Sequence, residues 1–357
     1  MNAEIELPTF SFSAFIASLR FKRLFLFGRG SVAPCSFVFL MFSGCCHFDR
    51  VNAERSQLIA RLQNEMLNQT DWLRIHAAEA LLDHGQSAHI VELFKPEADA
   101  ALPPYRIGVW RVLARGCGAT LGPLSQTLSG TLAETPQNST KFATKFATKE
   151  RKQDRWDQLY VERIRSVLRD PAATDRISAA ESLGKLDVAN PRDDEMIAQW
   201  LTTADDATAV FPRWLLCLSS SDAKRDDHET ALAKYLSSPD AIARLRAGFV
   251  LGRLKNISPN SLAALRHQLN LEPADSIARV YLITAVLLHS NETTETEPLK
   301  KQLIPYLHGK VNEQLEAGII LGMVGNETDL RILRPNLRSP EPDARIGAAN
   351  GMLRLLK

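Results

Sequence analysis

The chain has 357 residues, of which 45% are hydrophobic and 24% are charged, as in an ordinary soluble globular protein. Its 43 basic and 41 acidic side chains leave a formal net charge of +2, which argues against the strongly basic surface of a nucleic-acid-binding domain. Aromatic residues make up only 7%, while Leu and Ala, which have high helix propensity, are abundant. The composition favours an α-helical protein with no nucleic-acid partner.

The first 48 residues have the organisation of an export signal. A basic region ending at Arg29 comes first, and the apolar run SVAPCSFVFLMF follows at 31–42. A basic region, a short apolar region and small residues before a cut site are typical of such signals. The run is shorter than the roughly 20 apolar residues of a membrane-spanning helix. We therefore expect an exported protein of the cell envelope, with a cytoplasmic location as the alternative.

Phe42, Ser43, Gly44 and Cys45 resemble the bacterial lipobox. The resemblance covers these four positions only, and Leu is usual where Phe42 stands. It implies that Cys45 is lipidated and becomes the new amino terminus, so that several acyl chains hold the protein firmly to a membrane. A secretory signal that is cleaved without lipidation is the alternative.

From about residue 55 onward the chain repeats one pattern every 31–35 residues, with two intervals of about double length. An Arg, here called position zero, is followed by apolar residues at plus one and plus seven and by small or apolar residues at plus three and plus four. One double interval holds a weaker copy with Phe211 and Cys217, and the other should hold a copy near residue 141. Such a period is typical of a solenoid. The clear starts are Arg74, Arg106, Arg176, Arg244, Arg279, Gln314 and Arg345.

Each copy predicts two helices. Positions plus one, plus four and plus eight share one helix face, and a small residue at plus four lets a neighbouring helix come close. Helix-start residues precede the copies, as in SSPD at 237–240, where Asp caps the helix. No run alternates with the period of a strand, so an all-α chain is predicted. Second helices are expected at 87–94, 155–168, 193–201, 228–236, 261–269, 299–307 and 330–337.

Two helices in thirty-odd residues, with Asp–Arg punctuation and an Ala–Ala or Ala–Gly step, resemble the HEAT repeat, and most closely the short HEAT-like type of the phycobilin lyases. The resemblance covers about residues 55–357. It implies a right-handed α-solenoid of about eight to nine helical hairpins, whose concave face, formed by the second helices, binds extended partners. Tetratricopeptide repeats have a similar period, but their consensus is not reproduced copy by copy.

The arginine at position zero allows two interpretations. A row of cations could line a groove and bind a partner. Alternatively, each Arg bonds carboxylates or carbonyls in the adjacent turn between helices, near Asp71, Asp175, Asp240, Asp275 and Asp343. We expect the structural role, because a feature that recurs in every repeat serves to hold the stack together.

The repeats divide into a first group at 49–115 and an array at 153–357, separated by an insertion at 116–152. The insertion is rich in Ser, Thr, Gly and Lys and contains the tandem KFATKFAT. We interpret it as a duplication tolerated in an exposed loop. Its lysines could instead form a basic arm that docks on an acidic partner.

The candidate partner-binding residues lie in the two least repetitive segments, 71–77 and 103–110. Large aromatic and polar side chains stand there where other copies use small aliphatic residues, and aromatics and Arg are enriched in interaction hot spots. Alternatively, they fill a wider gap between the first repeats. The candidates are Trp72, His76, Tyr105, Arg106 and Trp110.

No sequence motif carries catalytic chemistry. HExxH, GxSxG, Walker A and GxGxxG patterns are absent, and the five cysteines include no CxxC spacing. HEAT-like deoxyhypusine hydroxylases carry several His-Glu pairs that hold two irons, whereas this chain has one such pair, His228-Glu229. We therefore expect no catalysis, no metal and no cofactor.

The expected function is a scaffold that binds a protein partner through the concave face of the array, next to a membrane. The alternative is a lyase-like or enzyme-accessory module that holds a small ligand in the groove. A continuous stripe along the inner helices would favour the scaffold, and one deep cavity with convergent polar groups would favour the ligand module.

Overall fold

The computed structural model describes residues 35–128, 156–290 and 292–356, and every regular element in these ranges is a helix. The prediction of an all-α chain is confirmed. The chain divides into two compact units, which meet between Asp49 and Arg50. Helix α1 (Cys35–Asn68) contributes its part from Arg50 onward to the second unit, which also holds all the later helices.

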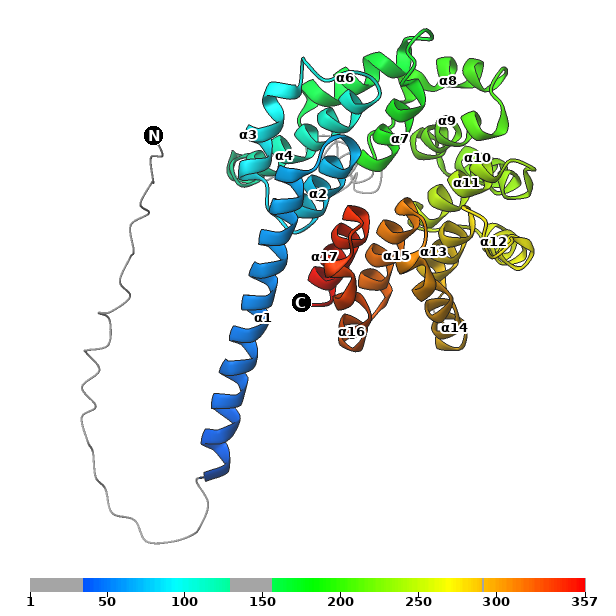
Figure 1. Ribbon diagram of the computed structural model, residues 1–357. Coiled ribbons are helices and arrows are strands. Elements are labelled where there is room, and N and C mark those ends of the chain that lie inside the picture. The colour runs from blue at the N-terminus through cyan, green and yellow to red at the C-terminus, as the bar shows by residue number, and fades with distance from the viewer. Residues whose placement is uncertain (1–34, 129–155, 291, 357) are drawn as a thin grey trace, which may run out of the picture. The chain divides into compact units, whose positions relative to one another are not determined.

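The helices of this unit form two alternating sets (Figure 1). The inner set, which carries position zero of each repeat, is α2 (Asp71–Asp83), α4 (Tyr105–Leu128), α7 (Arg176–Leu186), α9 (Asp206–Ser219), α11 (Ala241–Arg253), α13 (Arg279–His289), α15 (Val311–Val324) and α17 (Pro342–Leu355). The outer set is α1, α3 (Ala88–Phe94), α6 (Gln158–Arg169), α8 (Asp194–Leu201), α10 (Asp222–Lys234), α12 (Pro259–Leu271), α14 (Thr293–Leu303) and α16 (Leu330–Leu333). Short 3-10 helices are η1 (Lys95–Glu97), η2 (Pro191–Asp193), η3 (Tyr235–Ser237), η4 (Ile304–His308), η5 (Glu327–Asp329) and η6 (Arg334–Arg338).

The contacts between inner helices close into a circle. Each inner helix packs against the next inner helix along the chain, from α2 to α17. Helix α17 then packs against α2 (Figure 1). A solenoid in the usual sense has two free ends, whereas here the first and last inner helices cover each other.

The circle contains eight inner helices among the described residues. The degraded copy expected near residue 141 falls outside the described residues. Helices α4 and α7, on either side of that position in the chain, contact each other directly. Helix α4 itself continues to Leu128, into the first part of the segment interpreted as an insertion.

The buried core follows the repeat. The residue at plus seven is no more than 1% exposed in every inner helix, since it points into the layer between the two helix sets. One of these residues is Cys217, and burial raises the pKa of its thiol to about 11. The set is Leu81, Leu113, Leu183, Cys217, Leu251, Val286, Leu321 and Met352.

Glycines set the closest approach of two helices, α15 and α17. A Cβ atom built on Gly322 would lie 2.3 Å from the Cα of Gly351, and one built on Gly318 would lie 2.5 Å from the carbonyl carbon of Gly347. Real Cβ atoms do not come this close, so only glycine allows the two backbones to pack at this distance.

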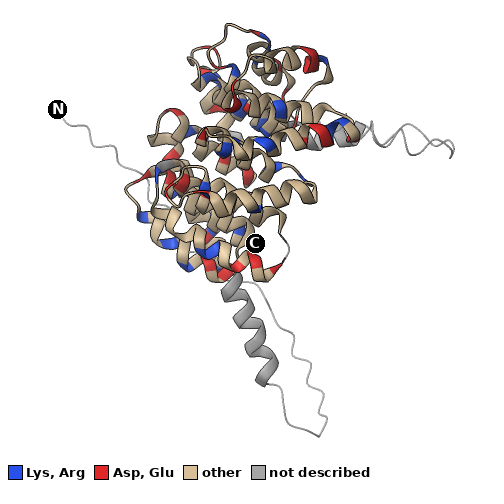
Figure 2. Ribbon diagram, turned by 90° about the vertical axis from the view of Figure 1, so that its right-hand side faces the viewer, with Lys and Arg blue, Asp and Glu red and all other residues tan. Residues whose placement is uncertain are grey.

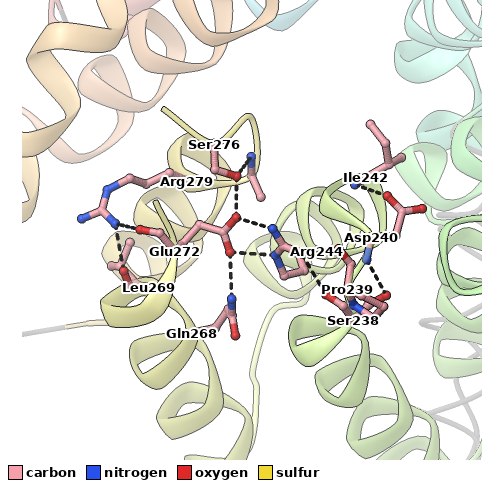
Figure 3. A network of polar contacts seen from close by, with 11 residues as sticks. Ser238, Pro239, Asp240, Ile242, Arg244, Gln268, Leu269, Glu272, Ser276 and Arg279 are labelled. Carbon is pink, nitrogen blue, oxygen red and sulfur yellow. Dashed lines mark hydrogen bonds and ion pairs between the residues drawn. The ribbon is translucent and has the colours of Figure 1, made fainter. Parts of the chain in front are cut away.

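The position-zero arginines join neighbouring hairpins, as the structural interpretation expected. Arg244 donates to both carboxylate oxygens of Glu272 at 2.8 Å, and to the backbone oxygens of Ser238 at 2.8 Å and Pro239 at 3.0 Å (Figure 3). Arg279 donates to backbone oxygens at the end of α12 in the same network. These arginines are therefore occupied within the protein.

Several polar contacts cross the interface between α1–α2 and η6–α17, here called the seam. Arg345 pairs with Glu65, and the Nδ1 atom of His76 lies 3.0 Å from Oδ1 of Asp343. Arg354 donates to Asp83 at 2.6 Å. Two further contacts, from Arg61 to the backbone oxygen of Leu337 and from His84 to Asn350, extend along it.

Candidate functional site

The inner helices surround a cavity of about 850 Å³. All eight contribute to its wall, most often with the residues at plus two, plus five and plus nine of the repeat. The expectation that the second helices of the hairpins form the concave face is wrong, because the helices that carry position zero line the cavity. Their small residues at plus three and plus four let neighbouring axes approach closely, and the more closely spaced layer takes the inside of the curve.

On the side of α2, α4 and α7, the charged groups of the wall neutralise one another. Arg111 donates to both carboxylate oxygens of Glu79, at 2.6 and 3.1 Å, and to Oγ of Ser182 at 2.8 Å. The Arg111 side chain is 2% exposed. Burial by itself would raise the pKa of Glu79, but the nearby positive charges, Arg111 first, hold it well below its usual range. Glu79 therefore stays ionised as the counter-charge of a buried arginine.

Further ion pairs extend this side of the wall across the seam. Arg115 and Arg354 share Asp83, at 2.5 and 2.6 Å. Lys185 lies 2.6 Å from Glu181 on the same helix. Asp83 and Glu181, like Glu79, thus each have a close cationic partner within the protein.

The opposite side of the wall, built by α9, α11, α13 and α15, is apolar and aromatic. Met323 is 49% exposed although it is a large apolar side chain. Exposed apolar side chains gathered in a concavity are typical of binding sites. The apolar and aromatic residues of this side include Leu245, Phe249, Tyr281, Leu288, Ile319 and Met323.

Two cations, Arg246 and Arg253, stand on this apolar side. Arg246 donates to the backbone oxygen of Ala207 at 2.7 Å and lies 5.2 Å from the ring centre of Phe211. Among the described residues no carboxylate forms an ion pair with Arg246, and burial lowers its pKa. Arg253 stacks 3.4 Å from the ring centre of Phe249.

Glu316 is the one carboxylate on that side of the wall, within the described residues. Its side chain is 7% exposed, and its Oε2 atom lies 3.6 Å from Nη2 of Arg253, beyond hydrogen-bond distance. Its Oε1 atom is buried without a hydrogen-bond partner. Burial and the charge of Glu316 raise the pKa of the neighbouring Tyr281. Because buried polar atoms are rarely left unpaired, Glu316 is an acceptor available to a ligand or water.

The predicted partner-binding residues make contacts within the first repeats. Trp110 donates from Nε1 to the backbone oxygen of Ala98 at 2.7 Å, and Tyr105 donates to Glu97 at 2.9 Å. Trp72 is half-buried against the core. These contacts agree with the alternative interpretation, in which the aromatic residues fill a gap between early repeats.

The two polar candidates also have partners within the protein. Arg106 donates to both oxygens of Asp175, at 2.7 and 2.9 Å. Of the five candidates, His76 alone lines the cavity, where it also belongs to the seam. The backbone of Cys45, the predicted lipid anchor, lies in α1, and its side chain is outside the described residues.

Apart from His76, the residues that line the cavity were not among those predicted from the sequence. Charged residues recur at plus five and plus nine of the first three copies, in Glu79, Arg111, Glu181 and their partners four residues on. This second periodic row was visible once position zero had been assigned. It indicates a polar helix face, but not whether that face meets solvent or a cavity.

Within the ranges that the structure describes, no group of three or more His, Cys, Asp or Glu side chains could hold a metal ion. No helix of those ranges has both the length and the apolarity needed to cross a bilayer. No family model, no curated protein and no solved structure matches the chain.

Proposed function

We propose that the protein is a non-catalytic binding module, a HEAT-like right-handed array whose inner helices enclose a ligand cavity. The observation that carries this proposal is the cavity of about 850 Å³, with polar groups converging from seven of the eight inner helices of the described residues and the ring of Phe211 from α9. Small-molecule sites typically measure about 300–1,000 Å³ and combine an apolar wall with a few placed polar groups. This was the runner-up expectation from sequence, and the closed circle of inner helices favours it over an open groove.

A blocked cavity tests this function. Ile319 is half-buried in the wall, so Ile319→Trp would fill part of the space. Leu271 is 63% exposed at the end of α12 and does not line the cavity, so Leu271→Trp is the matched control. The measurement is the thermal midpoint in the presence of organic anions, amines, sugars and nucleosides.

At least one of these classes should stabilise the wild type and the control, because a ligand at a hundred times its Kd adds about 2.7 kcal/mol. Ile319→Trp should lose that response. The proposal fails if no class shifts the wild-type midpoint, or if Ile319→Trp responds as the wild type does.

A protein partner remains the second candidate, supported by a different surface. A groove of about 630 Å³ lies between α1 and α3 and is lined by Met66, Leu67, Ile90 and Leu93. Leu67 is 61% exposed there, and an apolar groove beside a helix suits a partner segment. With the full chain as bait, Leu67→Asp should abolish recovery of a specific partner from membrane extracts, while Ile319→Trp should not.

We also propose that Cys45 carries a lipid anchor at the cell envelope. The basic region, the apolar run and the small residues before Cys45 support it. Mass spectrometry of the mature amino terminus tests it. A diacylglyceryl mass on Cys45 supports the anchor, and an intact Met1 rejects it.

A further inference from the structure

We infer that the ligand of the central cavity is an organic anion with an apolar or aromatic body, bound at Arg246 and Arg253 of α11. This inference rests on the proposed function, since it names the ligand class of the same cavity. It is carried by the charges of the wall, by the arrangement of α11 and by the unpaired oxygen of Glu316.

The charge of the wall is unbalanced. Seven Lys and Arg side chains line the cavity against four Asp and Glu side chains. Three of those carboxylates, Glu79, Asp83 and Glu181, already have a close cationic partner. The remaining one, Glu316, is 3.6 Å from Arg253. An anion would therefore enter a site with excess positive charge, whereas a cation would be repelled.

Arg246 has no carboxylate in ion-pair contact among the described residues. It is half-buried and donates a hydrogen bond to the backbone oxygen of Ala207. A desolvated guanidinium without a carboxylate is unfavourable, and a bound anion relieves that penalty. A guanidinium also recognises carboxylate, sulfonate and phosphate groups through two parallel hydrogen bonds.

The spacing on α11 suits a ligand with an apolar body. Arg246, Phe249 and Arg253 stand at intervals of three and four residues, so they share one helix face. The two arginines are about 10 Å apart along the helix axis. The same side of the wall contains Leu288 and Ile319 on α13 and α15, which would cover the apolar part of a ligand whose acid lies at the arginines.

Glu316 adds a requirement for a hydrogen-bond donor. Its buried Oε1 atom has no partner, and its side chain lines the same part of the cavity as Arg253. A ligand N–H or O–H group could satisfy this oxygen. The expected ligand thus combines an acid, an apolar body and a donor.

Anilinonaphthalene sulfonate has all three features and becomes fluorescent on binding. N-phenyl-naphthylamine has the same rings and N–H group without the sulfonate, so it is the matched neutral probe. Both are titrated into the full chain. Wild type should bind the sulfonate about tenfold more tightly, a difference of about 1.4 kcal/mol. Equal affinity for the two probes overturns the inference.

Substitutions of Arg246 test whether the sulfonate binds at this side chain. Arg246→Gln should weaken sulfonate binding about fivefold and leave the neutral probe unchanged, which also shows that the cavity has folded. Arg246→Lys should retain part of the sulfonate affinity because it keeps the charge. Arg192→Gln removes an exposed arginine of η2 that does not line the cavity and should change neither titration. Unaltered sulfonate binding by Arg246→Gln overturns the inference.

Ile319→Trp separates this inference from the proposed function. If it blocks binding of an amine or a sugar while the sulfonate shows no preference, the cavity is a ligand site and the anion assignment is wrong. If it blocks nothing, both fail. If the sulfonate binds but Ile319→Trp does not weaken it, the anion lies elsewhere and the inference is wrong.

Discussion

Arg345 and Glu65 stand 280 residues apart and form a two-bonded ion pair, with Nε–Oε1 and Nη2–Oε2 distances of 2.5 and 2.8 Å. Arg244 and Glu272 form the same pair in the middle of the array. In both cases the Arg lies in an inner helix, and the Glu lies near the end of the outer helix that comes next around the circle. The last hairpin therefore binds the first as its next neighbour.

We expect Glu65→Gln to lower the free energy of unfolding by about 1–3 kcal/mol, because Arg345 would lose its counter-charge at a largely buried site. Urea unfolding of Glu65→Gln, Arg345→Gln and the double variant measures the coupling between the two residues. A coupling energy below about 0.5 kcal/mol would show that the pair does not hold the seam. Glu272→Gln is the control for the same pair away from the seam.

Gly351→Ala should destabilise the protein by about 1–3 kcal/mol, the usual cost of overpacking. Its Cβ would lie 2.2 Å from the backbone oxygen of Gly318, and backbone cannot move aside as a flexible side chain can. Gly252→Ala is the comparison, because its Cβ would lie 3.1 Å from the Cα of Ala285. The thermal midpoint of Gly351→Ala should lie well below that of Gly252→Ala. Equal midpoints would contradict the packing explanation.

Glu79→Gln should cost about 3 kcal/mol, because it leaves the guanidinium of Arg111 buried without a counter-charge. Replacing both residues, as in Glu79→Leu with Arg111→Met, should restore much of that loss, since no buried charge remains. Denaturant unfolding of the single and double variants checks this. A double variant less stable than Glu79→Gln would mean that the pair also organises the cavity wall.

Acid should weaken the seam through His84. Burial lowers the pKa of His84 below its ordinary value of 6.5, although the hydrogen bond to Asn350 works in the other direction. The folded protein thus favours the neutral imidazole, and stability is present above about pH 6.5 and falls as the pH drops below it, when the unfolded chain gains a proton first.

His84→Gln removes this titration and keeps a hydrogen-bonding side chain. Denaturant unfolding is measured between about pH 7.5 and about pH 5, a range that brackets the ordinary imidazole pKa of about 6.5. Over this range, the free energy of unfolding should fall less in His84→Gln than in wild type. The pKa of His228 is lowered as well, by burial first and then by Arg213, so His228→Gln is the matched variant away from the seam. Identical pH slopes for wild type and His84→Gln would refute the assignment.

Much of the fold was predictable from sequence because it depends on local residue patterns within each repeat. The period, the two helices per repeat and the apolar residue at plus seven follow from the positions of Leu81, Leu183 and Leu251 in the chain. The bonding role of the arginines followed from their recurrence, and Arg244 shows it. Both charges occur interspersed on the helices (Figure 2), in keeping with the near-neutral composition.

The candidate site was less predictable, for a reason visible in particular residues. Trp110 and Tyr105 stood out because they break the pattern, yet their polar atoms are occupied by Ala98 and Glu97. Arg246 and Arg253 drew no attention because surface arginines on a helix are common. A residue's type does not reveal whether its helix face meets solvent, a partner or a cavity.

The sequence by itself determined the helices, their pairing and the residues that form the layer between them, since these depend on contacts between neighbouring hairpins. Only the tertiary structure decided that α17 meets α2, which helix set lies inside and which charges share the cavity. These features depend on the small rotation between successive hairpins, summed over eight of them. That rotation is set by side-chain packing at every interface, and no single segment of the chain encodes the sum.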